Sequence, residues 1–97
     1  MLRHVALFQW SESTTDDDIA AVAEGLAALP AAIPEIRAFR YGRDAGINEG
    51  ARDFAVVADF DTVEDYLVYR DHPAHTSFIA ERIAPHSAGR AFIQYEY

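Results

Sequence analysis

Residues 2–10 alternate in a way that predicts a β-strand with apolar side chains on both of its faces. Every second position shares one face, and these positions are Leu2, His4, Ala6, Phe8 and Trp10. The opposite face carries Val5 and Leu7 between Arg3 and Gln9. A strand with one solvated face is polar at alternate positions, and this strand is not. We therefore expect one face to pack on the protein core and the other to contact something else.

The same double pattern recurs in residues 51–60, which we predict to form another strand. One face is built from Phe54, Val56, Ala58 and Phe60. Ala55 and Val57 make the other face apolar as well. Alternating stretches at residues 36–41 and 90–97 predict two further strands, and the polar, glycine-containing residues 42–52 predict a loop.

The first of two predicted helices follows the first strand. Ser13 to Asp18 supplies capping side chains and acids, which the dipole of a helix N-terminus favours. We interpret this acidic run as a helix start and not as a cation site. Apolar residues then recur at helical spacing until Pro30, where we expect the helix to stop. These residues are Ile19, Val22, Ala23, Leu26 and Leu29.

The second predicted helix starts at Asp61 or Thr62, either of which can cap its N-terminus. Val63 and Tyr66 follow at helical spacing. Pro73 is expected to break or restart this helix, because proline suits a first helical position. The apolar spacing then resumes and continues to residue 85, a second proline.

The predicted order is β-α-β-β-α-β, a ferredoxin-like α+β fold in which the helices cover one face of a four-stranded antiparallel sheet. We expect residues 1–97 to form a single domain. The other face of the sheet keeps Val5, Leu7 and Val57, which would be exposed in a monomer. Exposed apolar patches mark interfaces. We therefore expect a homodimer in which the open faces of two sheets meet.

Composition narrows the possible functions. Hydrophobic residues make up 51% of the chain, which excludes a disordered protein. A net charge of −8 disfavours binding to nucleic acid. The chain has no cysteine, which excludes disulfides and thiolate sites and fits a cytoplasmic protein. No apolar run is long enough for a signal peptide or a membrane span, so we expect no membrane partner.

Three residues are candidates for catalysis: His75, Tyr69 and His4. An imidazole titrates near neutral pH, so His75 is a candidate general base. The Tyr69 hydroxyl can polarise a carbonyl oxygen, and His4 sits on the strand face that should point to the same pocket. Each also has a structural interpretation. His75 can bind a backbone carbonyl, Tyr69 can fill the core, and a lone histidine on an apolar strand is often a core residue.

Other candidates concern ligands and metals. Phe8, Phe54 and Phe78 are candidates for lining an aromatic pocket, with core packing as the alternative. His72 and His75 have a spacing found in metal sites, but Pro73 interrupts the helical register between them, so we expect no metal. Neither a phosphate-binding glycine loop nor a serine nucleophile motif is present, and we expect no cofactor.

Four segments in this order resemble the stress-responsive A/B barrel domain (Dabb) family across essentially the whole chain. The segments are His4-Val5-Ala6-Leu7-Phe8, Leu29-Pro30-x-x-Ile33-Pro34-x-Ile36, Asp53-Phe54-Ala55-Val56-Val57-x-x-Phe60 and Tyr69-x-x-His72-Pro73-Ala74-His75. The resemblance implies a ferredoxin-like domain whose dimer closes a barrel between two sheets, a dimeric α/β barrel. The single domain at 1–97 is thus similar to a Dabb domain.

The resemblance also suggests chemistry. Plant polyketide cyclases of the family use histidine and tyrosine residues between sheet and helices for an intramolecular aldol condensation. His4, Tyr69 and His75 match those pocket positions. The cyclases carry a further pocket histidine in the third strand, where this sequence has Phe54.

Together these features predict a homodimer that binds a small hydrophobic or aromatic carbonyl compound. If it is an enzyme, we expect cofactor-free acid/base catalysis of the cyclase, isomerase or lyase type. One alternative is a non-catalytic stress-response or assembly module whose purpose is the barrel interface. The other is a cofactor-free monooxygenase of aromatic polyketides.

Overall fold

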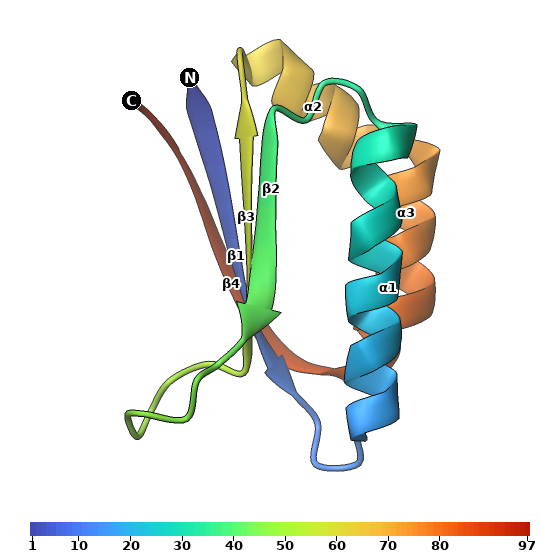
Figure 1. The fold of residues 1–97 in the computed structure, drawn as a ribbon, viewed down its shortest axis with the longest axis vertical. Helices are drawn as coiled ribbons and strands as arrows, with labels where there is room; N and C mark the ends of the chain where they lie inside the picture. Colours follow the sequence, from blue (N-terminus) through green and yellow to red (C-terminus); the bar gives the residue numbers. More distant parts are fainter.

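The computed structural model describes residues 1–97 as a four-stranded antiparallel sheet with helices on one side (Figure 1). The strands are β1 (Leu2–Trp10), β2 (Ala38–Arg43), β3 (Phe54–Phe60) and β4 (Ser87–Glu96). The helices are α1 (Asp16–Ala32), α2 (Val63–Asp71) and α3 (Pro73–Phe78). The strand order β2-β3-β1-β4 and the single helical layer confirm the predicted ferredoxin-like α+β fold.

The central strand β1 sets the register of the site. It pairs antiparallel with β3 on one side and with β4 on the other. His4 lies opposite Ala58 of β3 and Gln94 of β4. Phe8 lies opposite Arg90 of β4. Side chains of directly opposed residues share a face, so Gln94 and Arg90 lie on the same face as His4 and Phe8.

Helix α1 begins as predicted but ends later. Thr15 is the N-cap and forms a capping box with Asp18, in which each side chain accepts a hydrogen bond from the other residue's backbone N–H. The expectation that Pro30 stops the helix is wrong, because α1 continues through Pro30 to Ala32. Proline has no backbone N–H, so Pro30 costs this last turn one helical hydrogen bond. Burial of Leu29 and Ile33 on either side, at 3% and 0% exposed, holds the turn in place.

The predicted break at Pro73 is confirmed. Thr62 caps α2, which ends at Asp71, and Pro73 is the first residue of α3. His72 lies between them, and its ring Nδ1 accepts a hydrogen bond from the backbone N–H of Ala74 at 3.0 Å. After α3 the backbone widens into a π-helical turn, Ile79–Ile83, and closes with a 3₁₀ turn, Ala84–His86. The sequence analysis did not anticipate the π-helical turn.

Three strand boundaries differ from those predicted. β2 is shifted to Ala38–Arg43 from residues 36–41, β3 starts at Phe54 and not at residue 51, and β4 starts at Ser87 and not at residue 90. Alternation marks the middle of a strand, while pairing with a neighbour fixes its ends. Here Arg43 pairs with Phe54, which closes the β2–β3 hairpin beyond the apolar residues.

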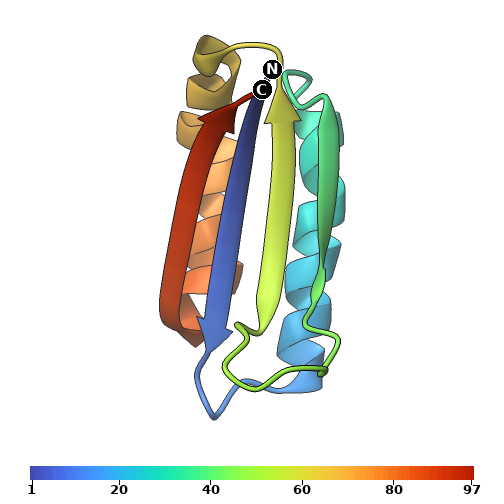
Figure 2. The ribbon, with the colours of Figure 1, turned by 90° about the vertical axis from the view of Figure 1, so that its left-hand side faces the viewer.

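Figure 2 views the sheet from the side that no helix covers. Val5, Leu7 and Val57 lie half-buried on this open face, while Ile93 of β4 is 60% exposed. An ion pair that the sequence analysis missed also lies here: the guanidinium of Arg3 donates two hydrogen bonds to the carboxylate of Asp59, at 2.7 and 2.8 Å. The open face is therefore apolar in its middle, with the Arg3–Asp59 pair toward one end and the exposed Arg40 of β2 at its edge. No helix combines the length and apolar character needed to span a membrane.

Candidate functional site

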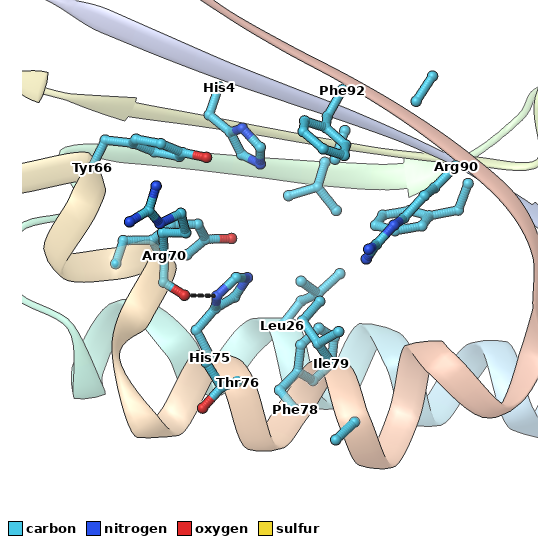
Figure 3. Close-up of a pocket in the computed structure, with 16 residues that line it drawn as sticks. His4, Leu26, Tyr66, Arg70, His75, Thr76, Phe78, Ile79, Arg90 and Phe92 are labelled. Atoms are coloured by element: carbon cyan, nitrogen blue, oxygen red, sulfur yellow. Dashed lines mark hydrogen bonds between the residues drawn. The ribbon is translucent and has the colours of Figure 1, made fainter.

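A cavity of about 360 Å³ lies between the helical layer and the β1–β4 half of the sheet (Figure 3). Of its 16 lining residues, 11 are hydrophobic, as is usual for small-molecule sites. The other five are His4, Arg70, His75, Thr76 and Arg90, and two of the hydrophobic residues, Tyr66 and Tyr69, also carry a hydroxyl group. The cavity therefore has an apolar body with a small number of polar groups that can orient a ligand.

The position of the cavity follows from the sheet order. β4 is an edge strand that pairs only with β1, and none of its residues is buried. On the helix side of β4, Phe92 is 61% exposed although it lies next to Ala6 of β1, which is 8% exposed. The helices thus pack closely on β3 and leave a hollow between the helical layer and the β1–β4 edge of the sheet. The cavity opens to solvent along this edge.

His75 enters the cavity from α3 with one ring nitrogen already engaged. Its Nδ1 lies 3.0 Å from the backbone carbonyl oxygen of Arg70, the contact drawn as a dashed line in Figure 3. A carbonyl only accepts, so Nδ1 carries the proton and donates. In the neutral ring Nε2 is then an unprotonated acceptor. Burial lowers the pKa of His75, partly offset by that carbonyl, so the neutral form is favoured at neutral pH.

His4 enters from β1 in the opposite tautomer. The side-chain amide nitrogen of Gln94 lies 2.8 Å from His4 Nδ1. An amide nitrogen only donates, so Nδ1 accepts and the neutral ring carries its proton on Nε2. Burial, with a smaller contribution from the charge of His75, lowers the pKa of His4 to about 4. His4 is therefore a neutral hydrogen-bond donor at neutral pH.

Tyr69 lies between the two histidines. Its ring centre is 4.2 Å from that of His75 and 6.0 Å from that of His4. The side chain is 3% exposed, and burial raises the pKa of Tyr69, so the hydroxyl keeps its proton. This hydroxyl has no partner within the chain and the residue lines the cavity, so its proton is available to a ligand.

The three side chains form a complementary set in one apolar enclosure. His75 Nε2 can accept a proton, and the Tyr69 hydroxyl and His4 Nε2–H can donate hydrogen bonds. Hydrogen bonds are stronger in such a low-dielectric site than in water. The arrangement can therefore remove a proton from a bound molecule and stabilise the negative charge that develops on a neighbouring oxygen.

Comparison with known proteins identifies the family. Residues 2–97 match the family described as Dabb, the stress responsive A/B barrel domain. The chain belongs to the Dabb family. Among curated proteins, none is similar enough in sequence to count as a match.

Solved structures agree with this assignment. A dimeric ferredoxin-like protein of unknown function from Thermobifida fusca is 43% identical, with a TM-score of 0.92 over 99% of this chain and 90% of that one. A dimeric protein of the same fold from Bacteroides fragilis is 27% identical, with a TM-score of 0.84 over 99% and 95% of the two chains. A hydroxynitrile lyase from Passiflora edulis is 19% identical, with a TM-score of 0.84 over 97% and 90%, and shares the fold.

In this Dabb domain, two of the three predicted pocket phenylalanines line the cavity. Phe8 and Phe78 do so, whereas Phe54 lies outside it and packs against Trp10, with ring centres 5.8 Å apart. Phe54 lies near the end of the hairpin, opposite Phe8, where α1 fills the space above the sheet. The third strand therefore contributes core packing at this position.

Tyr66, Arg70 and Arg90 also line the cavity of the Dabb domain and were not predicted from the sequence. Tyr66 stands three positions before Tyr69, so helical spacing could have placed it beside Tyr69, whereas Arg70 directly follows Tyr69 and had no such signal. Arg90 had no such signal, because the face on which it lies depends on how β4 pairs with β1. Figure 3 shows Tyr66 beside His4, and their ring centres are 5.2 Å apart.

His72 and His75 of the Dabb domain have different roles in the structure. The His72 ring caps α3, and the His75 ring binds the Arg70 carbonyl and faces the cavity. No group of three or more histidine or acidic side chains is placed to hold a metal ion.

Proposed function

We propose that this Dabb domain binds a small hydrophobic or aromatic carbonyl compound in the cavity and catalyses proton transfer without a cofactor. The observation that carries the proposal is the opposite tautomers of His75 and His4. Their backbone and side-chain partners leave an acceptor on His75 and a donor on His4 facing one cavity. These partners satisfy one buried nitrogen of each ring, and the second nitrogen of each ring is the one left for a ligand.

The proposed step breaks a C–H bond next to the carbonyl group. The proton goes to Nε2 of His75, and the electron pair moves onto the carbonyl oxygen to form an enolate. The Tyr69 hydroxyl and His4 Nε2–H donate hydrogen bonds to that oxygen. Return of the proton to another carbon of the enolate system gives isomerisation. Attack of the enolate carbon on a second carbonyl of the same molecule gives cyclisation, and the resulting alkoxide takes the proton back from His75. No oxidant or reductant is required.

Measurement of hydrogen–deuterium exchange tests this step without knowledge of the natural substrate. Phenylacetone is a suitable probe, because it is a small aromatic ketone with exchangeable hydrogens next to its carbonyl. Proton NMR in deuterated buffer follows the loss of these hydrogens. We expect the protein to accelerate exchange above buffer and His75→Gln to reduce that acceleration by about 100-fold or more, the usual contribution of a general base.

His72→Asn is the matched control. It removes the neighbouring imidazole, which does not line the cavity, and keeps a side chain that caps α3 well. Exchange by this variant should equal that of the unmodified protein. Exchange no faster than in buffer, or a fully active and folded His75→Gln protein, contradicts the proposal. The first outcome is what the alternative of a non-catalytic assembly module predicts.

We also propose that the chain is a single domain that forms a homodimer through the open sheet face. The similar proteins from T. fusca and B. fragilis are described as dimeric, which supports the dimer. The apolar side chains of Val5, Val57 and Ile93 on the open face support the choice of surface. Analytical ultracentrifugation should show a dimer at micromolar concentration, and a monomer there contradicts this part of the proposal.

A further inference from the structure

The geometry points to a carboxylate on the ligand, bound by Arg90 at the open edge of the cavity. The substrate class is then a keto acid or a related acidic carbonyl compound, and not a neutral ketone or aldehyde. This inference rests on the proposed function, since it concerns the same cavity. The inference adds a carboxylate to the proposed ligand, and it assigns Arg90 as the residue that distinguishes acidic from neutral ligands.

The charge of the cavity is opposite to that of the chain. The whole chain has 16 acidic and 8 basic residues. The cavity lining contains Arg70 and Arg90 and no aspartate or glutamate. An anion that enters the cavity therefore meets positive charge on an otherwise negative protein.

Only one of the two arginines is free to bind an anion. Arg70 donates hydrogen bonds from Nε and Nη2 to both carboxylate oxygens of Asp71, at 2.9 and 3.0 Å. Arg90 has no carboxylate within ion-pair distance. Its guanidinium carbon lies 5.9 Å from the ring centre of Phe92, and Figure 3 shows the group turned toward the cavity. A guanidinium presents a planar fork that matches the two oxygens of a carboxylate.

The sheet register separates the acid end of such a ligand from its carbonyl end. Gln94 marks the level of His4 and Arg90 marks the level of Phe8. The strand rises by about 13 Å between residues 90 and 94. Because the arginine side chain is long, the distance from the Arg90 guanidinium to the His4 ring can be shorter than this rise. Ala6 and Phe92 line the apolar middle. The site thus suits a molecule with a carbonyl at one end, an apolar body and a carboxylate at the other.

Two probes that differ only in charge test the inference. The acid is 5-benzoylpentanoate, an aryl ketone joined to a carboxylate by a butylene chain, and the neutral partner is its methyl ester. Isothermal titration calorimetry at neutral pH and low salt gives both dissociation constants. We expect the acid to bind roughly tenfold more tightly than the ester, the size of one charge-assisted contact at a partly exposed site.

The variants separate Arg90 from general electrostatics. Arg90→Gln should remove the preference for the acid and leave the affinity for the ester unchanged, and Arg90→Lys should restore part of the preference. Arg52→Gln is the matched control, because Arg52 is exposed in the loop, forms no ion pair and does not line the cavity. It should keep the full preference.

Three results overturn the inference: equal affinity for acid and ester, a preference that survives in Arg90→Gln, or tighter binding of phenyl phosphate than of the acid. None of them affects the exchange of phenylacetone, which carries no charge. Exchange without acid selection therefore leaves the proposed function standing and removes the carboxylate. Acid selection without exchange leaves a binding site for acids and removes the catalysis.

Discussion

The two faces of the central β1–β3 pair have similar apolar side chains and very different surroundings. On the helix side, Ala58 and Phe60 are both 0% exposed beneath the helices. On the open side, Val5 and Val57 oppose one another with no helix above them, and the neighbouring Ile93 is 60% exposed. One chain therefore covers the first face and leaves the second uncovered.

This difference shows what an apolar pattern determines. Alternation specifies that a face must be covered, but the covering element depends on the rest of the fold. The helix side itself is covered unevenly, because α3 and the turn after it stand off the β1–β4 edge of the sheet and leave a hollow there. Incomplete cover on that side produces the cavity, and absence of cover on the other side produces the proposed interface.

The largest effect on stability is expected at the fully covered part of the helix side. Phe60→Ala removes a completely buried ring that contacts the rings of Tyr66 and Tyr69. We expect the free energy of unfolding to fall by about 3–5 kcal/mol, measured by denaturant titration. Phe92→Ala removes the same side chain from the same face over the hollow, and we expect a loss below about 1 kcal/mol. Equal losses contradict the uneven cover described above.

A charged substitution tests whether the open face forms the proposed dimer interface. Ile93→Asp places one carboxylate from each chain in a two-fold interface, where neither finds a partner. We expect the dissociation constant of the dimer to rise by roughly 100-fold or more in sedimentation experiments. Ile47→Asp makes the same change at a loop residue that is 80% exposed, and it should leave the dimer intact. A dimer that tolerates Ile93→Asp uses another surface.

A smaller effect is expected where α1 meets the cavity wall. A Cβ atom added to Gly25 would lie 2.5 Å from Cδ1 of Phe78, which lines the cavity. Gly25→Ala gains helix propensity of about 1 kcal/mol but forces the Phe78 ring to move. We expect a net loss of about 1–2 kcal/mol in unfolding free energy, together with weaker binding of aromatic probes.

The double variant Gly25→Ala with Phe78→Leu checks the cause. The smaller leucine should relieve the clash, so the double variant should be more stable than the sum of the two single changes predicts. Strict additivity of the two changes means that the Gly25–Phe78 contact does not limit the packing.

The sequence was sufficient for the features that depend on neighbours along the chain. The alternation of β1 and β3, the caps at Thr15 and Thr62 and the restart at Pro73 are all local, and each is present in the structure. Pro30 was misjudged because local propensity predicts a break, while the burial of the residues around it favours a helix. The π-helical turn after α3 had no recognisable local signal.

The candidate site was only partly predictable for the same reason. His4, Tyr69 and His75 were selected by residue type, and the fold places all three at one cavity. Their tautomers depend on Gln94 and on the Arg70 carbonyl, and the first of these partners lies 90 residues away in sequence. The role of Arg90 depends on the register of β4 against β1, which alternation does not define.

The most gradual effect concerns pH and separates the cavity from the open face. The pKa of His4 is about 4 in the folded protein, whereas an unperturbed histidine titrates near 6.5. Between these values the unfolded chain binds a proton that the folded one does not, so unfolding free energy should fall as the pH drops from about 6.5 to 4. One proton limits this slope to about 1.4 kcal/mol per pH unit, and we expect less because the cavity admits water.

Variants assign this slope to the cavity. His4 faces Tyr66, Tyr69, Gln94 and His75, and of these only His75 titrates in the same range; burial lowers its pKa too. His4→Gln should therefore flatten the slope, and combination with His75→Gln should flatten it further. On the open face, the Arg3 guanidinium lowers the pKa of Asp59, so that pair loses its contribution only below about pH 4. A His4→Gln protein with the full slope shows that the protonation of His4 does not differ between the folded and unfolded chains.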